Sequence, residues 1–159
     1  SLIIMPVATI DSKSIDTAFD GYIHLVFILW DEKNALPELF PDGDNKDEYT
    51  FTIRDDGRYA IDLDKEAFAV SSNRYYILAE VTDFYAEAIE KTDIMDIVSF
   101  SDSPQWVEER DIPVDRNGDE MVYVCQAELK KATNLDAVLF AFYSPGTHSV
   151  KHIVQYRDE

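Results

Sequence analysis

Three histidines are the side chains of this 159-residue chain best suited to bind a transition metal: His24, His148 and His152. His148 and His152 are four residues apart, a spacing that on a helix presents two ligands to one ion. Their surroundings, SVKHIVQY, alternate polar and apolar residues, which predicts a strand instead. Four residues of strand separate two side chains by roughly 13 Å, too far for one ion. We therefore predict no metal site at this pair, and a hydrogen-bonded core position for His24.

No arrangement typical of a catalytic nucleophile is present. Cys125 is the single cysteine and lies in the apolar stretch MVYVC, which predicts a buried thiol outside any disulfide framework. The chain has no GxSxG motif and no Gly-rich phosphate-binding loop. Carboxylates are so abundant that no pair can be singled out as acid and base. We therefore expect neither an enzyme nor a bound cofactor.

Two acidic loops place oxygen ligands at alternate positions, as calcium sites do. They are residues 42–48 (DGDNKDE) and residues 115–120 (DRNGDE). Neither completes the twelve-residue EF-hand pattern, since in the second loop Glu120 stands where Gly is required and Gln126 where the bidentate Glu belongs. A hairpin turn at Asn117 and Gly118 explains the second loop without any metal. Calcium at these loops stays an alternative, and we predict no metal site.

Charge is the abnormal property of the chain: 32 acidic against 14 basic residues give a formal net charge of −18. Such a chain repels nucleic acid and anionic membranes, and it attracts basic proteins through steering that weakens as salt rises. From Tyr123 onward acidic and basic residues balance, so the whole excess lies before that point. We expect a basic protein partner, with no nucleic acid and no membrane. The alternative is that the acidity serves solubility alone.

Two stretches concentrate candidate partner-binding residues, and a third adds carboxylates from a loop. On a helix, Asp83, Glu87 and Glu90 share one face, where like charges cost a few tenths of a kcal/mol per pair. A stripe of this kind favours a partner-binding role, and a solvated helix face is the alternative. Trp106, just before paired carboxylates, is either an interface anchor rimmed by charge or a plug of the core. The full predicted set is Asp83, Glu87, Glu90, Asp93, Trp106, Glu108, Glu109, Asp42, Asp44, Asp47 and Glu48.

The elements that position these residues are mainly strands. Residues 21–30 (GYIHLVFILW) form the longest apolar run, which predicts a strand covered on both faces, with the rest of the chain packed around it. The pattern predicts a hairpin over 49–64 that turns at Asp55, Asp56 and Gly57. Other strands are predicted at 2–10, where Pro6 indicates an edge or an irregularity, and at 75–81, 121–127, 136–143 and 149–156. Residues 94–100 are either a second helical turn or a strand, and the strand is favoured. Short helical segments are predicted at 65–70, 84–91 and 128–134.

This inventory indicates one mainly β domain over residues 1–159, a β-sandwich or partly open barrel of about eight strands with one or two short helices. No signal peptide is visible, which favours a cytoplasmic location. We expect an acidic protein-binding inhibitor of immunity or antitoxin type that neutralises a basic partner such as a nuclease. The alternative is a β-sandwich binding module, or a virion or assembly component, that recognises a carbohydrate or a neighbouring subunit, with or without calcium. Oligomeric state and strand order are left open.

Overall fold

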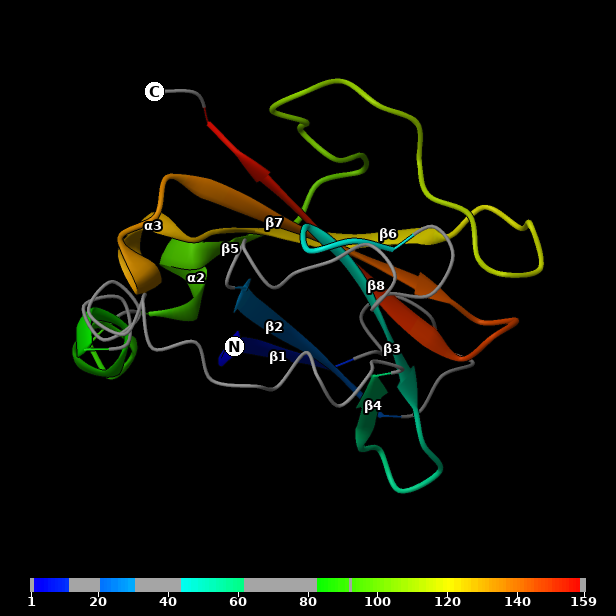
Figure 1. Ribbon diagram of the computed structural model, residues 1–159, viewed down its shortest axis with the longest axis horizontal. Helices are drawn as coiled ribbons and strands as arrows, with labels where there is room; N and C mark the ends of the chain where they lie inside the picture. The colour runs from blue at the N-terminus through cyan, green and yellow to red at the C-terminus, as the bar shows by residue number, and fades with distance from the viewer. Residues whose placement is uncertain (1, 12–20, 31–43, 62–82, 92, 158–159) are drawn as a thin grey trace.

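Two antiparallel sheets make up the protein, in a computed structural model that describes residues 2–11, 21–30, 44–61, 83–91 and 93–157 (Figure 1). The fold is mainly β, with eight strands and three short helices among the described residues, in a β-sandwich-like arrangement. The fold class predicted from the sequence is therefore confirmed. The helical segment predicted at 65–70 and the strand predicted at 75–81 lie outside the described residues.

The smaller sheet pairs β1 (Leu2–Asp11) with β2 (Tyr22–Trp30). The register shifts between Pro6 and Ala8, which confirms the irregularity that a proline in a strand predicts. Leu25 and Phe27 are fully buried, as the apolar run of β2 predicts.

The larger sheet has six strands. Its order is β4 (Tyr59–Ile61), β3 (Glu48–Ile53), β8 (Ser149–Tyr156), β7 (Ala137–Ser144), β6 (Val122–Glu128) and β5 (Val98–Ser99). The β3–β4 hairpin is confirmed, with Gly57 at φ +83° in its turn. β7 is buried at all eight positions. Residues 21–30 were predicted as the strand at the centre of the packing, but they lie in the two-stranded sheet. An apolar run reports burial on both faces and does not report strand order.

Side chains of the large sheet close the open edge of β2. The backbone amides of His24, Val26 and Ile28 are contacted in turn by the Tyr59 hydroxyl at 2.6 Å, the His152 Nε2 at 3.3 Å and the Tyr49 hydroxyl at 3.1 Å. The Tyr49 hydroxyl also donates to the Val26 carbonyl at 2.8 Å. Buried backbone groups are costly without partners, so these three side chains join the two sheets at an edge of β2 where no further strand within the described ranges pairs with it.

His152 is the central group of this seam. It is fully buried, its ring stacks on Tyr49 with centroids 5.5 Å apart, and its Nδ1 has no hydrogen-bond partner within the described structure. Burial lowers the pKa of His152 to about 3, because a charged imidazole would lose its hydration there. The ring is therefore neutral and structural at physiological pH.

The opposite face of the large sheet carries a second, smaller apolar cluster. Its buried members are Met121, Val138, Phe140, Phe142 and Ile153, with Trp106, Ile112 and Tyr123 packed against them. In Figure 1 the small sheet lies on one side of the large sheet, and the long connection between β5 and β6, coloured green to yellow, rises on the other. This connection, residues 100–121, therefore takes the place of a second covering layer.

The helices are short. A helix over 83–89 agrees with the prediction for 84–91, and its Tyr85 hydroxyl donates to the Pro6 carbonyl of β1. Of the two alternatives for 94–100, the helical turn is right for the first four residues, which form α2 (Ile94–Ile97), and the favoured strand is right for β5. The cause is Asp93, whose carboxylate accepts from the Met95 amide at 3.0 Å and caps the helical turn. α3 (Lys130–Thr133) ends at Asn134, with φ +63°.

Candidate functional site

Residues 83–109, named here the acidic segment, hold eight acidic residues and a single basic one, Lys91. All eight carboxylate side chains belong to exposed residues. Within the described part of the chain the only ion pair they make is Glu87 to Lys91, at 3.3 Å between two side chains that are themselves about three-quarters exposed. A pair so open to water adds little to stability. The acidic segment is therefore an almost uncompensated anionic surface.

The acidic segment also exposes apolar side chains among its carboxylates. Met95 is 68% exposed and Phe100 is 52% exposed. Phe84, Ile94 and Val107 are exposed as well, so five of the ten large apolar residues found exposed in the described structure lie here. Apolar groups rimmed by charge are the usual composition of a protein-binding surface.

The predicted site residues of the acidic segment lie in two places. Asp83, Glu87 and Glu90 lie on or just after the helix over 83–89, and Asp93 caps α2. Glu108 and Glu109 lie in the connection that crosses the outer face of the large sheet. The segment thus forms a band that includes β5, the edge strand of that sheet, and not one compact disc.

Trp106 packs against the outer face of the large sheet. Its ring lies 4.6 Å from that of Phe140 and 5.7 Å from that of Phe142, measured between centroids, and the residue is half-buried. The sequence leaves two roles open for Trp106, packing against the core or anchoring an interface. The structure shows the ring packed against the apolar cluster on the outer face of the sheet. Val107, beside it, is the residue exposed to solvent.

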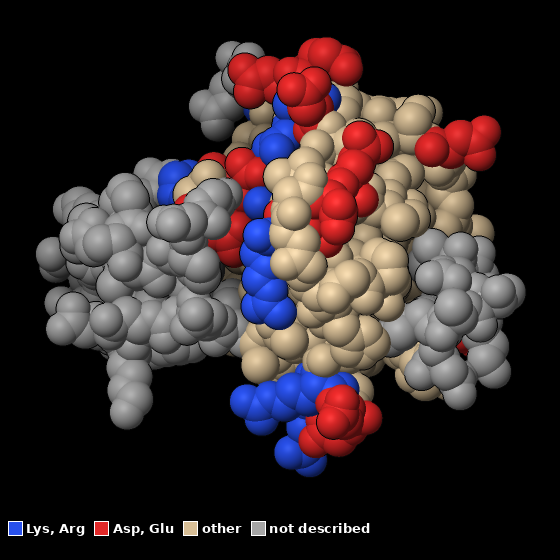
Figure 2. Space-filling model, turned by 90° about the vertical axis from the view of Figure 1, so that its right-hand side faces the viewer, with Lys and Arg blue, Asp and Glu red and all other residues tan. Residues whose placement is uncertain are grey.

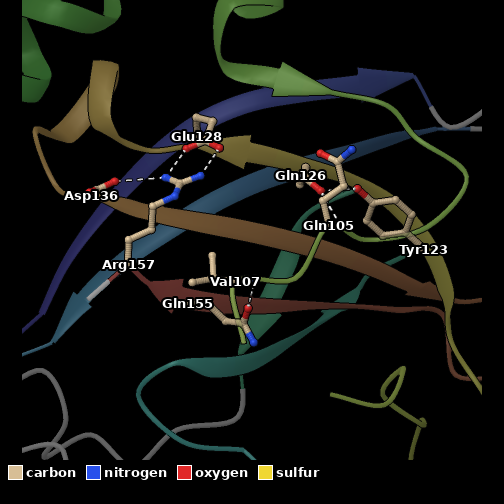
Figure 3. A network of polar contacts seen from close by, with 8 residues as sticks. All are labelled: Gln105, Val107, Tyr123, Gln126, Glu128, Asp136, Gln155 and Arg157. Atoms are coloured by element: carbon tan, nitrogen blue, oxygen red, sulfur yellow. Dashed lines mark hydrogen bonds and ion pairs between the residues drawn. The ribbon is translucent and has the colours of Figure 1, made fainter. Parts of the chain in front are cut away.

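Two glutamines of the sheet hold the chain on either side of Trp106 (Figure 3). The Gln126 carboxamide oxygen accepts from the Gln105 amide at 2.9 Å. The Gln155 oxygen accepts from the amides of Val107 and Glu108 at 2.9 and 3.0 Å, and its nitrogen donates to the Glu108 carbonyl at 2.8 Å. The side-chain amides of Gln126 and Gln155 satisfy backbone groups of the loop that would be paired with a neighbouring strand if the loop were part of a sheet. These bonds fix the position of the loop half of the acidic segment.

Other carboxylates are paired within the fold. The Arg157 guanidinium donates two hydrogen bonds to the Glu128 carboxylate, at 2.7 and 2.5 Å, and one to Asp136 at 3.1 Å (Figure 3). These two carboxylates raise the pKa of Arg157 further above its ordinary value. Such a fork ties the ends of β6, β7 and β8 together, so these acids have a structural role.

A polar cavity of about 780 Å³ opens at the β3–β8 end of the large sheet's outer face. Thr50, Thr52, Ser149 and Lys151 form its floor, and residues 110–116 form one wall. The cross-strand pairs Thr50–Lys151 and Thr52–Ser149 bring the four floor residues together from segments about a hundred residues apart. Sequence analysis did not find this cavity.

An ion-pair network lies along the cavity. The Lys151 Nζ contacts the Asp44 carboxylate at 3.3 Å and Glu48 at 3.9 Å, and Arg110 contacts Glu48 at 2.9 Å while its guanidinium lies over the Trp106 ring. Asp44 and Lys151 have side chains only 7% and 11% exposed. Burial raises the pKa of Asp44, and its bonds from Lys151 and Thr50 offset part of that effect.

The predicted site residues of the first acidic loop therefore lie apart from the acidic segment. Asp44 and Glu48 belong to the cavity network, and Asp47 contacts Lys46 at 3.2 Å. Asp42 lies outside the described residues. Figure 2 shows one face of the molecule on which Lys and Arg run in a column with Asp and Glu on both sides, so charge is mixed there.

The second acidic loop is a turn whose first carboxylate is already engaged. Asp115 accepts from the amides of Asn117 and Asp119 and from the Ser144 hydroxyl, at 2.9, 3.1 and 2.6 Å. The Ser144 bond is the main cause that lowers the pKa of Asp115. Gly118 adopts φ +83°, which the predicted turn requires. Across the described ranges, no three His, Cys, Asp or Glu side chains gather as metal ligands would.

The remaining groups that could do chemistry are placed as structural side chains. Cys125 is fully buried, and burial raises the pKa of its thiol to about 12. His24 is half-buried, with its Nδ1 bonded to the Thr9 hydroxyl at 3.0 Å, so the predicted hydrogen bond is present. His148 directly precedes β8, and His152 lies within it, in agreement with the predicted strand.

The sequence does contain a signal for the floor of the cavity. Thr50 and Thr52 alternate with apolar residues in YTFTIR, and Ser149 and Lys151 do so in SVKHIVQY. Each pattern places hydroxyl and charged groups on one face of a predicted strand. That β3 and β8 are neighbours is a tertiary fact, which no local pattern contains.

No helix in the described ranges has the length and apolar character needed to span a membrane. No protein-family model, no curated protein and no solved structure matches the chain.

Proposed function

We propose that the protein is a cytoplasmic inhibitor of immunity or antitoxin type, which binds a basic partner protein such as a nuclease through its acidic segment. The observation that carries this proposal is the state of the segment's eight carboxylates, which are all exposed and, in the described structure, share one exposed ion pair. A basic partner supplies the missing countercharges.

The helical half of the segment, residues 83–97, is the centre of the proposed surface. It combines five carboxylates with three exposed apolar residues, Phe84, Ile94 and Met95. Burying these apolar groups against a partner supplies binding energy, while the carboxylates around them accelerate association and select a basic surface. On a nuclease, carboxylates spaced along a helix would occupy the sites that otherwise bind phosphates.

Several acids outside the acidic segment differ from those within it. The carboxylates Asp44, Glu48, Glu128 and Asp136 have basic partners inside the protein, and Asp115 has hydrogen-bond donors. In the acidic segment, by contrast, only Glu87 has a basic partner among the described residues and Asp93 caps α2, which supports a binding role for the other carboxylates.

The test is a pull-down from an extract of the source cells at low salt, followed by elution in a salt gradient. The neutralised variant carries Asp83→Asn, Glu87→Gln, Glu90→Gln and Asp96→Asn. The matched control carries the same change of charge on exposed acids elsewhere: Asp55→Asn, Asp56→Asn, Asp119→Asn and Glu120→Gln.

The proposal predicts that the unaltered protein and the control capture the same basic protein, released over a narrow range of salt, and that the neutralised variant does not. Capture that is equal in all three proteins, or that survives roughly 0.5 M salt unchanged, would contradict it. A captured protein counts as support only when the purified chain also inhibits its activity.

A further inference from the structure

The polar cavity is a second candidate binding site, separate from the acidic segment and not needed for the proposed inhibition. Its volume of about 780 Å³ lies within the range of small-molecule sites. It is lined by four carboxylates and three basic side chains, so its charge is nearly balanced. A strongly charged ligand therefore finds no net field of opposite sign there.

Four of the seven charged groups of the cavity are paired with one another. Lys151 contacts Asp44 and Glu48, and Arg110 contacts Glu48. An anionic or cationic ligand that binds through Lys151, Asp44, Glu48 or Arg110 has to separate these pairs, which disfavours its binding where the groups are buried. A neutral ligand with hydroxyl groups does not, because each hydroxyl can donate to a carboxylate and accept from a neighbouring ammonium or guanidinium while the pair stays intact.

The other surfaces of the cavity have the complementary chemistry. The floor contributes the hydroxyls of Thr50, Thr52 and Ser149, and the wall adds the apolar residues Ile112, Pro113 and Val114. Val114 is 55% exposed, so it is open to contact. A pyranose ring has the same two characters, with hydroxyls at its edge and C–H groups on its faces.

We infer that the cavity between β3, β8 and residues 110–116 binds a neutral, polyhydroxylated ligand, a mono- or oligosaccharide. Hydroxyls of the sugar exchange hydrogen bonds with the Lys151–Asp44 and Arg110–Glu48 pairs, and its C–H face packs on the wall of Ile112, Pro113 and Val114. Arg110 is held in place for this role by Glu48 and by the Trp106 ring, whose centroid lies 5.6 Å from the guanidinium carbon.

The test is binding of the purified protein to a glycan array, followed by calorimetric titration with each neutral sugar that binds. Glucuronic acid, glucosamine and inorganic phosphate serve as charged probes. Thr52→Trp fills the cavity from an exposed position of β3, where an aromatic side chain suits a strand. Val122→Trp places the same side chain at an exposed position of β6 outside the cavity, and circular dichroism checks that both variants are folded.

The inference predicts that at least one neutral glycan binds, with an affinity that changes less than about twofold between roughly 0.05 and 0.5 M salt. Thr52→Trp lowers that affinity at least tenfold and Val122→Trp leaves it unchanged. Three results overturn the inference: no neutral glycan binds, only the charged probes bind, or Thr52→Trp binds as well as the unaltered protein. Each is independent of the pull-down, since the neutralised variant keeps every residue of the cavity.

Discussion

The acidic residues at the β3–β8 end of the large sheet and those of the acidic segment have the same chemistry in different surroundings. Asp44 is nearly buried and contacts the Lys151 ammonium at 3.3 Å. Glu87 has a lysine at the same distance, but both side chains are about three-quarters exposed. The first pair is part of the packing, and the second is screened by water and salt. Surroundings, not residue type, decide which acids stabilise this fold.

This comparison also separates two kinds of function. Where charges are paired and desolvated, they form a preorganised polar site suited to a small neutral ligand. Where they are exposed and uncompensated, they form the surface that we propose binds a large basic partner. The β5–β6 connection contributes residues to both surfaces, the acidic segment and the cavity wall. Trp106 and the two glutamines fix its course between them.

Breaking the buried pair has the largest expected effect. Lys151→Met leaves the Asp44 carboxylate nearly buried without its cation, which we expect to cost about 3–5 kcal/mol in the free energy of unfolding. Urea denaturation measures this loss. The double variant Asp44→Leu/Lys151→Met removes both charges and recovers most of it. A loss below about 1 kcal/mol in the single variant would show that water reaches the pair and that the two regions do not differ.

Removing the plug of the β5–β6 connection comes next. Trp106→Ala deletes the ring that packs on Phe140 and Phe142, and we expect it to cost about 3 kcal/mol, since the side chain is half-buried. Thermal unfolding measures the effect. Val107→Ala, at the exposed neighbour, is the control and changes stability by less than about 0.5 kcal/mol. Equal effects of the two substitutions would contradict the assignment of Trp106 as the packed residue.

The seam between the sheets gives a pH dependence that neither acidic region explains. The folded-state pKa of His152 is lowered to about 3, below its ordinary value near 6.5, so the unfolded state binds the proton more tightly. The stability that the neutral ring contributes is complete above pH 6.5 and is lost as pH falls towards 3, by up to about 1.4 kcal/mol per pH unit. Between pH 6.5 and 5 the expected loss is roughly 1.5 kcal/mol.

Denaturation of His152→Gln over the same pH range isolates this contribution. The variant is less stable at pH 7, because it loses the ring that stacks on Tyr49, and its stability falls less steeply between pH 6.5 and 5. An identical slope in the two proteins would assign the pH dependence to other groups.

The smallest effect on stability belongs to the acidic segment. The neutralised variant changes only exposed carboxylates, so its free energy of unfolding stays within about 0.5 kcal/mol of the unaltered protein or rises slightly as like-charge repulsion is relieved. Chemical denaturation at low and at high salt measures this. A loss of more than about 2 kcal/mol would mean that the fold itself uses these carboxylates.

Local patterns were enough to predict most of the strands, because alternation and turn residues act over a few positions. The β3–β4 hairpin with Gly57 and the turn at Gly118 are examples. At 94–97 the favoured strand was wrong and the alternative helical turn was right, because Asp93 caps a helical turn within a stretch that also has the composition of a strand.

The candidate site was predicted only in part, because exposure and pairing are tertiary properties. The sequence indicated the helical carboxylates but could not distinguish the exposed Glu90 from the nearly buried Asp44. Both lie in acidic stretches of similar composition. The partner of Asp44 is Lys151, more than a hundred residues away, and only the pairing of β3 with β8 brings it near.

The most direct test of the account is the affinity of the purified chain for its captured basic partner, measured at roughly 0.05 and 0.5 M salt for three proteins. These are the unaltered chain, the neutralised variant and the matched control. The account predicts that the neutralised variant binds at least tenfold more weakly at low salt, that the control binds as the unaltered chain does, and that high salt reduces the difference. Equal affinities of all three proteins at low salt would contradict it.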